Sequence, residues 1–260
     1  MNSEPHAQRG SVTGPFAASS AAPTALILAA GIGQRLGGDG RPKCLLEFGG
    51  RSLLARHIAL LHEAGVTAIT VVVGYRAGSV CGALSNGVKT VFNPDFAEGS
   101  TVSLWAGREA LCTGGPVLLM DADVIYDRRM LGRLLGGRAP NTLLLDRSLE
   151  PGDEPVKLCI RDGRIVDFHK RPQEPHDWRG ESVGFFRFTP DTAVELAERA
   201  AAYVSGGGRH MEYEEPIRDM IVSSPPGRFG FEDITGLPWT EIDFPEDVER
   251  ARALLPELVP

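Results

Sequence analysis

The chain has 260 residues, 42% hydrophobic and 23% charged, a composition typical of a globular protein whose core suits one α/β domain. Its formal net charge of −7 excludes the basic surface of a nucleic-acid-binding protein, but a nucleotide site needs only local positive charge and a divalent metal. No segment reaches the ~20 apolar residues of a membrane helix and the four cysteines form no CxxC pair, so we expect a soluble, cytoplasmic protein without membrane or nucleic-acid partners.

The first 22 residues differ in composition from the remainder. Residues 1–22 are rich in Ala, Ser, Pro and polar side chains without hydrophobic periodicity, which predicts a disordered tail. Residues 23–260 are then expected to form a single domain, with a hairpin insertion at about 147–181.

The first predicted strand breaks abruptly into a glycine-rich loop. Residues 26–43 read LILAAGIGQRLGGDGRPK. A buried strand running into glycines brings backbone N–H groups against a phosphate chain, and Arg35 and Lys43 add cationic donors there. A dehydrogenase fingerprint requires a third glycine where this chain has Leu36, and a phosphate-loop NTPase requires Gly-Lys-Ser/Thr. The loop therefore indicates a different kind of phosphate site.

The next elements alternate between helix and strand. Apolar residues recur at helical spacing over 52–64, before Gly65, and residues 67–73 form an apolar, β-branched strand. A short helix at 76–84 and a strand at 88–92 follow. This rhythm predicts a doubly wound α/β sheet, which binds ligands at the carboxyl ends of its strands.

The segment 93–104 follows the third of these strands and opens a helix. It reads NPDFAEGSTVSL, in which Ser100 or Thr101 is expected to cap the helix.

A fourth buried strand, 116–120, ends in two carboxylates. Asp121 and Asp123 are two residues apart, so their side chains share one face of the strand. Mg²⁺ takes one or two protein carboxylates together with phosphate oxygens and water. The pair therefore predicts a Mg²⁺ site.

The second half of the chain begins with a strand and a hairpin. A strand at 141–146 precedes two alternating stretches at 155–171, and Asp162-Gly163 between them is a strong hairpin signal. We expect this hairpin to leave the parallel core and to form one wall of the ligand-binding site. A returning strand at 182–188 begins beside Glu181, and helices are expected at 190–203 and 212–222.

The last predicted strand, 239–243, runs into a terminal helix at 248–255. Pro245 suits the first helical position, and Glu246 and Asp247 suit the first turn, where the helix dipole favours acids.

Taken together, these motifs resemble the nucleotidyltransferase (pyrophosphorylase) superfamily, whose Rossmann-like, GT-A-like mixed sheet carries a small β-rich acceptor-binding insertion. The resemblance covers residues 24–254. The glycine-loop signature is met by Ala29, Ala30, Gly31, Gly33, Arg35, Pro42 and Lys43.

The resemblance implies a role for each part of the site. Arg35 and Lys43 are the catalytic cations, and Asp123 and Asp243 bind Mg²⁺. The nucleotide is expected to contact Leu28, Ala29, Ala30, Gly31, Gly33, Asn93, Gly99, Ser100, Thr101, Ser103 and Asp121. The acceptor is expected to contact Lys157, Lys170, Glu181 and Tyr213.

The sequences of these motifs are most similar to those of small enzymes that use CTP, including phosphocholine, 2-aminoethylphosphonate and inositol-phosphate cytidylyltransferases. We therefore expect transfer of CMP from CTP to a small phosphonate or phospho-alcohol, with release of pyrophosphate. Gly99-Ser100-Thr101 and Glu181 depart from the inositol-phosphate pattern. The alternatives are a sugar-1-phosphate enzyme using another NTP and a non-catalytic nucleotide sensor. The resemblance also implies a homodimer, the common oligomeric state in this family.

Overall fold

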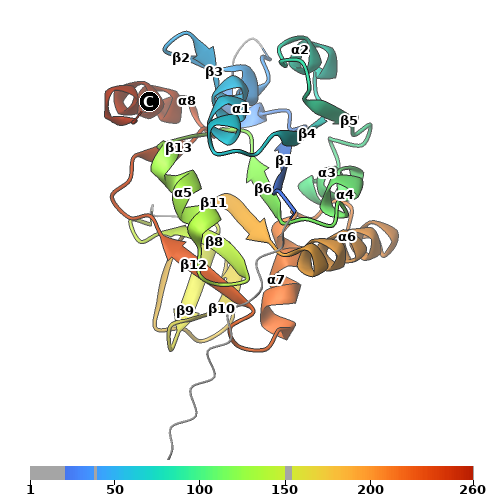
Figure 1. Ribbon diagram of the computed structural model, residues 1–260, viewed down its shortest axis with the longest axis vertical. Helices are drawn as coiled ribbons and strands as arrows, with labels where there is room; N and C mark the ends of the chain where they lie inside the picture. Colours follow the sequence, from blue (N-terminus) through green and yellow to red (C-terminus); the bar gives the residue numbers. More distant parts are fainter. Residues whose placement is uncertain (1–20, 38–39, 150–153, 260) are drawn as a thin grey trace, which may run out of the picture.

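A computed structural model describes residues 21–37, 40–149 and 154–259 (Figure 1). The tail expected at 1–22 lies almost entirely outside the described residues. None of the helices within these ranges combines the length and the apolar character that crossing a bilayer requires.

One large mixed sheet organises the molecule. Its parallel part contains four strands, in the order β5 (Lys89–Phe92), β4 (Ala68–Val73), β1 (Thr24–Ala29) and β6 (Val117–Asp121). Strand β11 (Trp178–Phe188) continues the sheet antiparallel to β6. The strands beyond it are β8 (Asn141–Asp146), β12 (Phe229–Asp233), β9 (Lys157–Arg161) and β10 (Arg164–His169).

Helices cover both faces of this sheet, which confirms the predicted doubly wound α/β fold. One face packs against α1 (Leu53–Glu63), α2 (Ala77–Gly82) and α5 (Arg128–Gly136). The other packs against α3 (Ser100–Ala106), α4 (Arg108–Leu111), α6 (Pro190–Ser205) and α7 (Glu214–Ser223). In β1, Ile27 faces the first group and Leu26 the second, as the period of two in a strand requires.

A smaller cluster forms around the C-terminal helix. Helix α8 (Pro245–Leu254) buries Ala251 against Phe48, Leu53 and Ile125. The remaining short elements are β2 (Glu47–Phe48), β3 (Arg51–Ser52), β7 (Val124–Tyr126), β13 (Trp239–Glu241) and the 3-10 turns η1 (Gln34–Leu36), η2 (Lys43–Leu45) and η3 (Leu255–Glu257). Strand β13, which precedes α8, pairs antiparallel with β7, the strand that follows β6.

The predicted hairpin is present, but its position differs from the expectation. Strands β9 and β10 turn at Asp162-Gly163, both with positive φ (51° and 72°), as a two-residue hairpin turn requires. The hairpin does not leave the sheet, because β9 pairs with residues 178–181 of β11 and extends it. Figure 1 shows these strands at the end of the molecule opposite α1 and α2.

Side-chain hydrogen bonds cap the starts of α1, α5 and α6, but not the start of α3. The Ser52 hydroxyl accepts a hydrogen bond from the Ala55 amide at 3.2 Å and starts α1. The prediction that Ser100 or Thr101 caps α3 is wrong: Gly99 is the N-cap residue, and the Ser100 hydroxyl accepts a hydrogen bond from the Tyr213 amide instead.

Candidate active site

A pocket of about 470 Å³ lies at the carboxyl ends of β1 and β6, where the fold class predicts a ligand. It collects most of the predicted site residues from segments far apart in the chain. The predicted residues that line it are Leu28, Ala30, Gly31, Gly33, Arg35, Lys43, Gly99, Ser100, Ser103, Asp121, Asp123, Lys170, Glu181, Tyr213 and Asp243.

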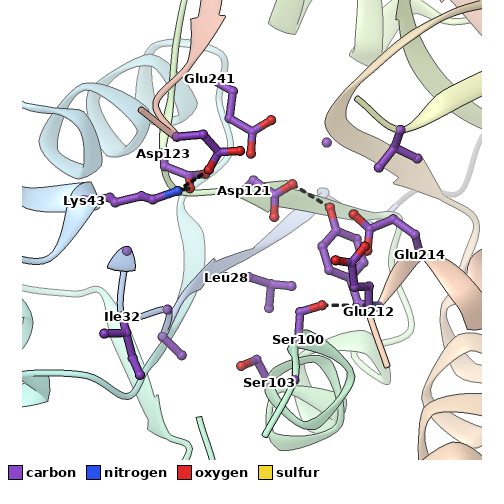
Figure 2. A pocket seen from close by; sticks show the side chains of 18 of the residues that line it. Leu28, Ile32, Lys43, Ser100, Ser103, Asp121, Asp123, Glu212, Glu214 and Glu241 are labelled. Carbon is purple, nitrogen blue, oxygen red and sulfur yellow. Dashed lines mark hydrogen bonds and ion pairs between the residues drawn. The ribbon is translucent and has the colours of Figure 1, made fainter. Parts of the chain in front are cut away.

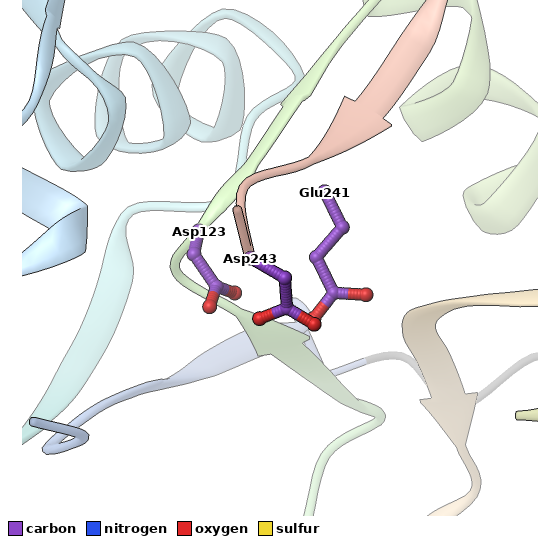
Figure 3. A group of neighbouring side chains, drawn as sticks. All are labelled: Asp123, Glu241 and Asp243. Atoms are coloured by element: carbon purple, nitrogen blue, oxygen red, sulfur yellow. The ribbon is translucent and has the colours of Figure 1, made fainter. Parts of the chain in front are cut away.

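Three carboxylates converge at one end of the pocket (Figure 3). Asp123 follows β6, while Glu241 and Asp243 lie at the end of β13, and the Ile242 amide donates to the Asp123 carbonyl at 3.0 Å. Each carboxylate places an oxygen within 4.8 Å of the others. The sequence prediction omitted Glu241, although its spacing of two residues from Asp243 is the same signal that paired Asp121 with Asp123.

Lys43 binds this carboxylate group directly. Its ammonium donates to Asp243 at 2.5 Å and to Asp123 at 3.1 Å. Burial alone would lower the pKa of Lys43, but the charges of Asp123 and Asp243 raise it above its ordinary value. Burial within the pocket, followed by the charges of Asp123 and Asp243, raises the pKa of Glu241. The group is therefore rich in negative charge and open to cations.

The donor set fits a hard divalent cation. All three side chains offer oxygen, which Mg²⁺ prefers, and they face a pocket with space for phosphate oxygens and water. Asp247 stabilises the backbone at residues 243 and 244, because its carboxylate accepts hydrogen bonds from the amides of Asp243 (2.9 Å) and Phe244 (2.7 Å). Asp247 thus orients the segment that carries Asp243.

The glycine loop packs tightly on Lys43. Gly33 has φ = 67°, and a Cβ atom built there would lie 2.8 Å from the Lys43 Cγ atom. Arg35 reaches the rim of the pocket, where its guanidinium is 3.1 Å from Glu154 and 3.4 Å from Asp243. Both predicted catalytic cations therefore flank the carboxylate group.

The predicted nucleotide-binding residues divide into those that line the pocket and those that support its wall. Ser100 and Ser103 face the pocket (Figure 2), whereas Asn93 is buried and donates to the Ser103 hydroxyl at 3.0 Å. Thr101 is buried behind the wall, and its amide donates to the Met211 carbonyl at 3.1 Å. Ala29 lines a smaller adjoining pocket of about 90 Å³.

Asp121 lies between the carboxylate group and the far end of the pocket (Figure 2). The Tyr213 hydroxyl donates to it at 2.6 Å. Gly184, with φ = 74°, packs so closely that a Cβ atom there would lie 2.1 Å from an Asp121 oxygen. Burial, and then the charges of Asp123 and Glu214, raise the pKa of Asp121 well above its usual range.

The two predicted acceptor lysines occupy different environments. Lys170 lines the pocket, and its ammonium donates to Glu212 at 2.9 Å and lies 3.7 Å from Glu154. Lys157 is 3% exposed and donates to the backbone carbonyls of Pro155 and Lys170 at 2.9 and 2.8 Å. The structure does not bring Lys157 into the pocket, because its ammonium is held by backbone carbonyls.

Two further acids at this end were outside the predicted site. Glu212 is exposed to the pocket, and Glu214 lines it with one carboxylate oxygen buried and without a hydrogen-bond partner among the described residues. Burial, and then the charge of Glu212, raise the pKa of Glu214 to about 8. Glu214 lies in the first turn of α7, and only the fold shows that it faces the pocket.

The amino-acid sequence of the chain is similar to those of known proteins. Residues 25–164 match the sequence profile of the MobA-like NTP transferase domain. The bifunctional IPC transferase and DIPP synthase of Rubrobacter xylanophilus is 29% identical, over 89% of this chain and 51% of the relative. The CMP-5'-(3-aminopropyl)phosphonate synthase of Streptomyces rubellomurinus is 30% identical, over 91% of this chain and 39% of the relative. The chain thus spans about half the length, or less, of these relatives.

A solved structure supports the fold. The inositol-1-phosphate CTP transferase of T. maritima superposes with a TM-score of 0.70, covering 91% of this chain and 98% of the other at 20% identity. At this identity the likeness concerns the fold. The profile match spans more than half of the chain and includes the glycine loop, Asp121 and Asp123. The chain therefore belongs to the MobA-like NTP transferase family, within the nucleotidyltransferase superfamily.

Proposed function

We propose that the protein transfers CMP from CTP to a small amine-bearing phosphonate or phospho-alcohol, releasing pyrophosphate. The proposal rests on the observation that the two ends of one pocket carry different sets of charged side chains. Lys43 and the carboxylates of Asp123 and Asp243 lie at one end, and Lys170 with Glu212 lies at the other. The similarity to a CMP-5'-(3-aminopropyl)phosphonate synthase supports CTP as the donor.

The proposed reaction needs no protein nucleophile. An acceptor oxygen, already anionic, attacks the α-phosphorus of CTP, and the bond between the α-phosphorus and the bridging oxygen of pyrophosphate breaks. Lys43 aligns the α-phosphate with the attacking oxygen, and Arg35 binds the leaving pyrophosphate. Bound by Asp123 and Asp243, Mg²⁺ would supply charge neutralisation on phosphate oxygens. The remaining catalysis is alignment in a preorganised site.

The charge of the pocket favours an acceptor with a positive group. Of the described residues, three basic side chains line it: Arg35, Lys43 and Lys170. Eight acidic side chains from the same described part of the chain also line it: Asp121, Asp123, Glu154, Glu181, Glu212, Glu214, Glu241 and Asp243. A metal ion offsets the carboxylates at one end. At the other end, we propose that Lys170 binds the acceptor's phosphonate and that the carboxylates of Glu212 and Glu214 bind an ammonium group.

An inositol-phosphate acceptor is the second candidate. It is suggested by the inositol-1-phosphate CTP transferase that shares the fold, and carboxylates also accept hydrogen bonds from hydroxyl groups. The two candidates differ in whether the acceptor contributes positive charge. An acceptor that lacks only the amine therefore separates them.

The test is pyrophosphate release with Mg²⁺, crossing CTP, UTP, GTP and dTTP with five acceptors. These are 2-aminoethylphosphonate, phosphocholine, inositol phosphate, glucose 1-phosphate and ethylphosphonate, the last being the control without an amine. We expect turnover with CTP and an amine-bearing acceptor, with kcat/KM at least about tenfold above that of ethylphosphonate, the loss expected from one charge-assisted contact. Turnover with inositol phosphate alone would favour the second candidate, and turnover with a sugar phosphate and another NTP would overturn both.

A further inference from the structure

The loop that connects α6 to α7 lies against the segment that precedes α3. We call the connecting loop, residues 208–213, the clasp, and we call residues 95–100 the base-binding loop. The Thr101 amide donates to the Met211 carbonyl at 3.1 Å, and the Tyr213 amide donates to the Ser100 hydroxyl at 2.8 Å. A Cβ atom at Gly99 would lie 2.6 Å from the Arg209 carbonyl oxygen. The two loops are therefore in direct backbone contact.

Arg209 fastens the clasp to the base-binding loop from the outside. Its guanidinium donates to Glu98 at 2.5 and 3.0 Å and to Asp95 at 2.7 Å. A single exposed ion pair contributes little, but a forked guanidinium shared by two carboxylates of one loop also fixes geometry. Asp95 and Glu98 do not line the pocket among the described residues, so Arg209 does not act on a ligand directly.

The clasp also forms part of the acceptor end of the pocket. Glu212 and Tyr213 line that end, and the Tyr213 hydroxyl donates to Asp121 at 2.6 Å. Tyr213 therefore links Ser100, on the nucleotide side, to Asp121 in the floor of the site. A displacement of the clasp would move both walls together.

We propose that Arg209 is a positioning residue that sets the base-binding loop for CTP and couples it to the acceptor wall. The inference rests on the proposed function, since it assigns the nucleotide to this loop. Without the Arg209 contacts, the base-binding loop keeps its hydrogen bonds through Thr101 and Ser100 but loses its ion pairs to the clasp. Gly99 and Ser100 are therefore held less rigidly. The nucleotide then binds more weakly, while Lys43 and the carboxylates keep their positions. By linkage, CTP that orders the base-binding loop also strengthens acceptor binding, and the acceptor strengthens CTP binding equally.

The test compares Arg209→Gln with a matched control, Arg199→Gln. Arg199 has the same exposed fraction, 33%, and bonds Glu195 at 2.9 Å on α6, away from the base-binding loop. For Arg209→Gln we expect KM for CTP to rise about tenfold with kcat within about threefold, as for one charge-assisted contact. Arg209→Lys should fall between this variant and the wild type. Arg199→Gln should behave as the wild type.

Two readouts separate positioning from general destabilisation. Hydrogen exchange of the Thr101 amide should be faster in Arg209→Gln and unchanged in Arg199→Gln, since that amide bonds the clasp. Glu98→Gln should reproduce the change in KM for CTP, and the double variant should add little to either single variant. Unchanged KM and unchanged Thr101 exchange in Arg209→Gln would overturn this inference and leave the proposed function intact. A wild-type protein that binds no NTP would overturn the proposed function, and this inference with it.

Discussion

At the scale of single residues, Lys43 is the group on which the proposed chemistry depends most. It is the cation bound between Asp123 and Asp243, and Gly33 packs against its side chain. Replacing it removes a charged donor from a preorganised site without leaving an unbonded backbone group. The effect should therefore fall on the chemical step.

Lys43→Ala is expected to lose about 10²–10³-fold in kcat, the cost typical of deleting one charge-stabilising donor. Lys89→Ala, at an exposed lysine on the edge strand β5, is the control and should change kcat by less than about twofold, as ordinary surface substitutions do. Steady-state pyrophosphate release measures both. A loss below tenfold in Lys43→Ala would remove Lys43 from the catalytic step.

Glu214 gives the site a pH dependence. Because its pKa is about 8, its carboxyl is mainly neutral below that pH and mainly ionised above it. An ammonium group binds the ionised form, so KM for an amine-bearing acceptor should fall as pH rises through about 8. Glu214→Gln should abolish this change, while KM for CTP stays the same. A wild-type KM for the acceptor that is constant from pH 6 to 9 would contradict the assignment.

The same carboxyl affects stability with the opposite sign. Its pKa is higher in the folded chain than its ordinary 4.5, so the folded state favours the proton. This contribution is fully present below pH 4.5 and is lost as pH rises towards 8. Melting temperature measured without ligand should therefore decline less steeply over pH 5–8 in Glu214→Gln than in the wild type. Equal slopes would show that Glu214 is not protonated in the folded state.

At the scale of elements, the strands and helices were predictable because their signals are local. Buried strands such as Ala68–Val73 appear as apolar runs, and the Asp162-Gly163 turn is specified by two residues. The partner of the hairpin was not predictable, since nothing in 155–171 shows that β9 pairs with β11. Similarly, Lys157 and Lys170 look equivalent in sequence, and only packing buries one and exposes the other to the pocket.

Strand β11 provides an element-scale test through Gly184. This residue has φ = 74° and lies against Asp121, so Gly184→Ala should destabilise the fold by about 1–3 kcal/mol and impair turnover. The control is Gly132→Ala in α5, where an added Cβ has no neighbour within 4 Å among the described residues. That substitution should be neutral or stabilising by up to about 1 kcal/mol. Chemical denaturation compares the two, and equal stabilities would contradict the close packing.

At the scale of the whole molecule, the site exists because distant segments meet at one edge of the sheet. The sequence motifs predicted the glycine loop, the β6 carboxylates and Asp243 as separate features of one site. Sequence spacing could not show that Glu154 and Glu212 join them, because these acids approach only in the folded chain. The acidic character of the pocket is therefore a tertiary property.

This acidity predicts how the intact protein responds to metal. CTP with Mg²⁺ should raise the melting temperature by stabilising the folded state, about 2.7 kcal/mol at a ligand concentration 100 times Kd. CTP with EDTA should give a much smaller rise, because the carboxylates of Asp123, Glu241 and Asp243 then repel the triphosphate. Asp243→Asn should reduce the difference between the two conditions. Equal shifts with and without Mg²⁺ would contradict a metal role for these carboxylates.

Cytidylyl transfer is measured most directly by ³¹P NMR of the products formed from CTP, Mg²⁺ and 2-aminoethylphosphonate. We expect free pyrophosphate and, in equal amount, a new phosphorus–oxygen–phosphorus linkage joining CMP to the phosphonate. Lys43→Ala, run at the same concentration, should yield neither product at a comparable rate. If CTP is instead cleaved to CDP and inorganic phosphate, or is bound and left intact with every acceptor tested, the protein is not the cytidylyltransferase proposed here.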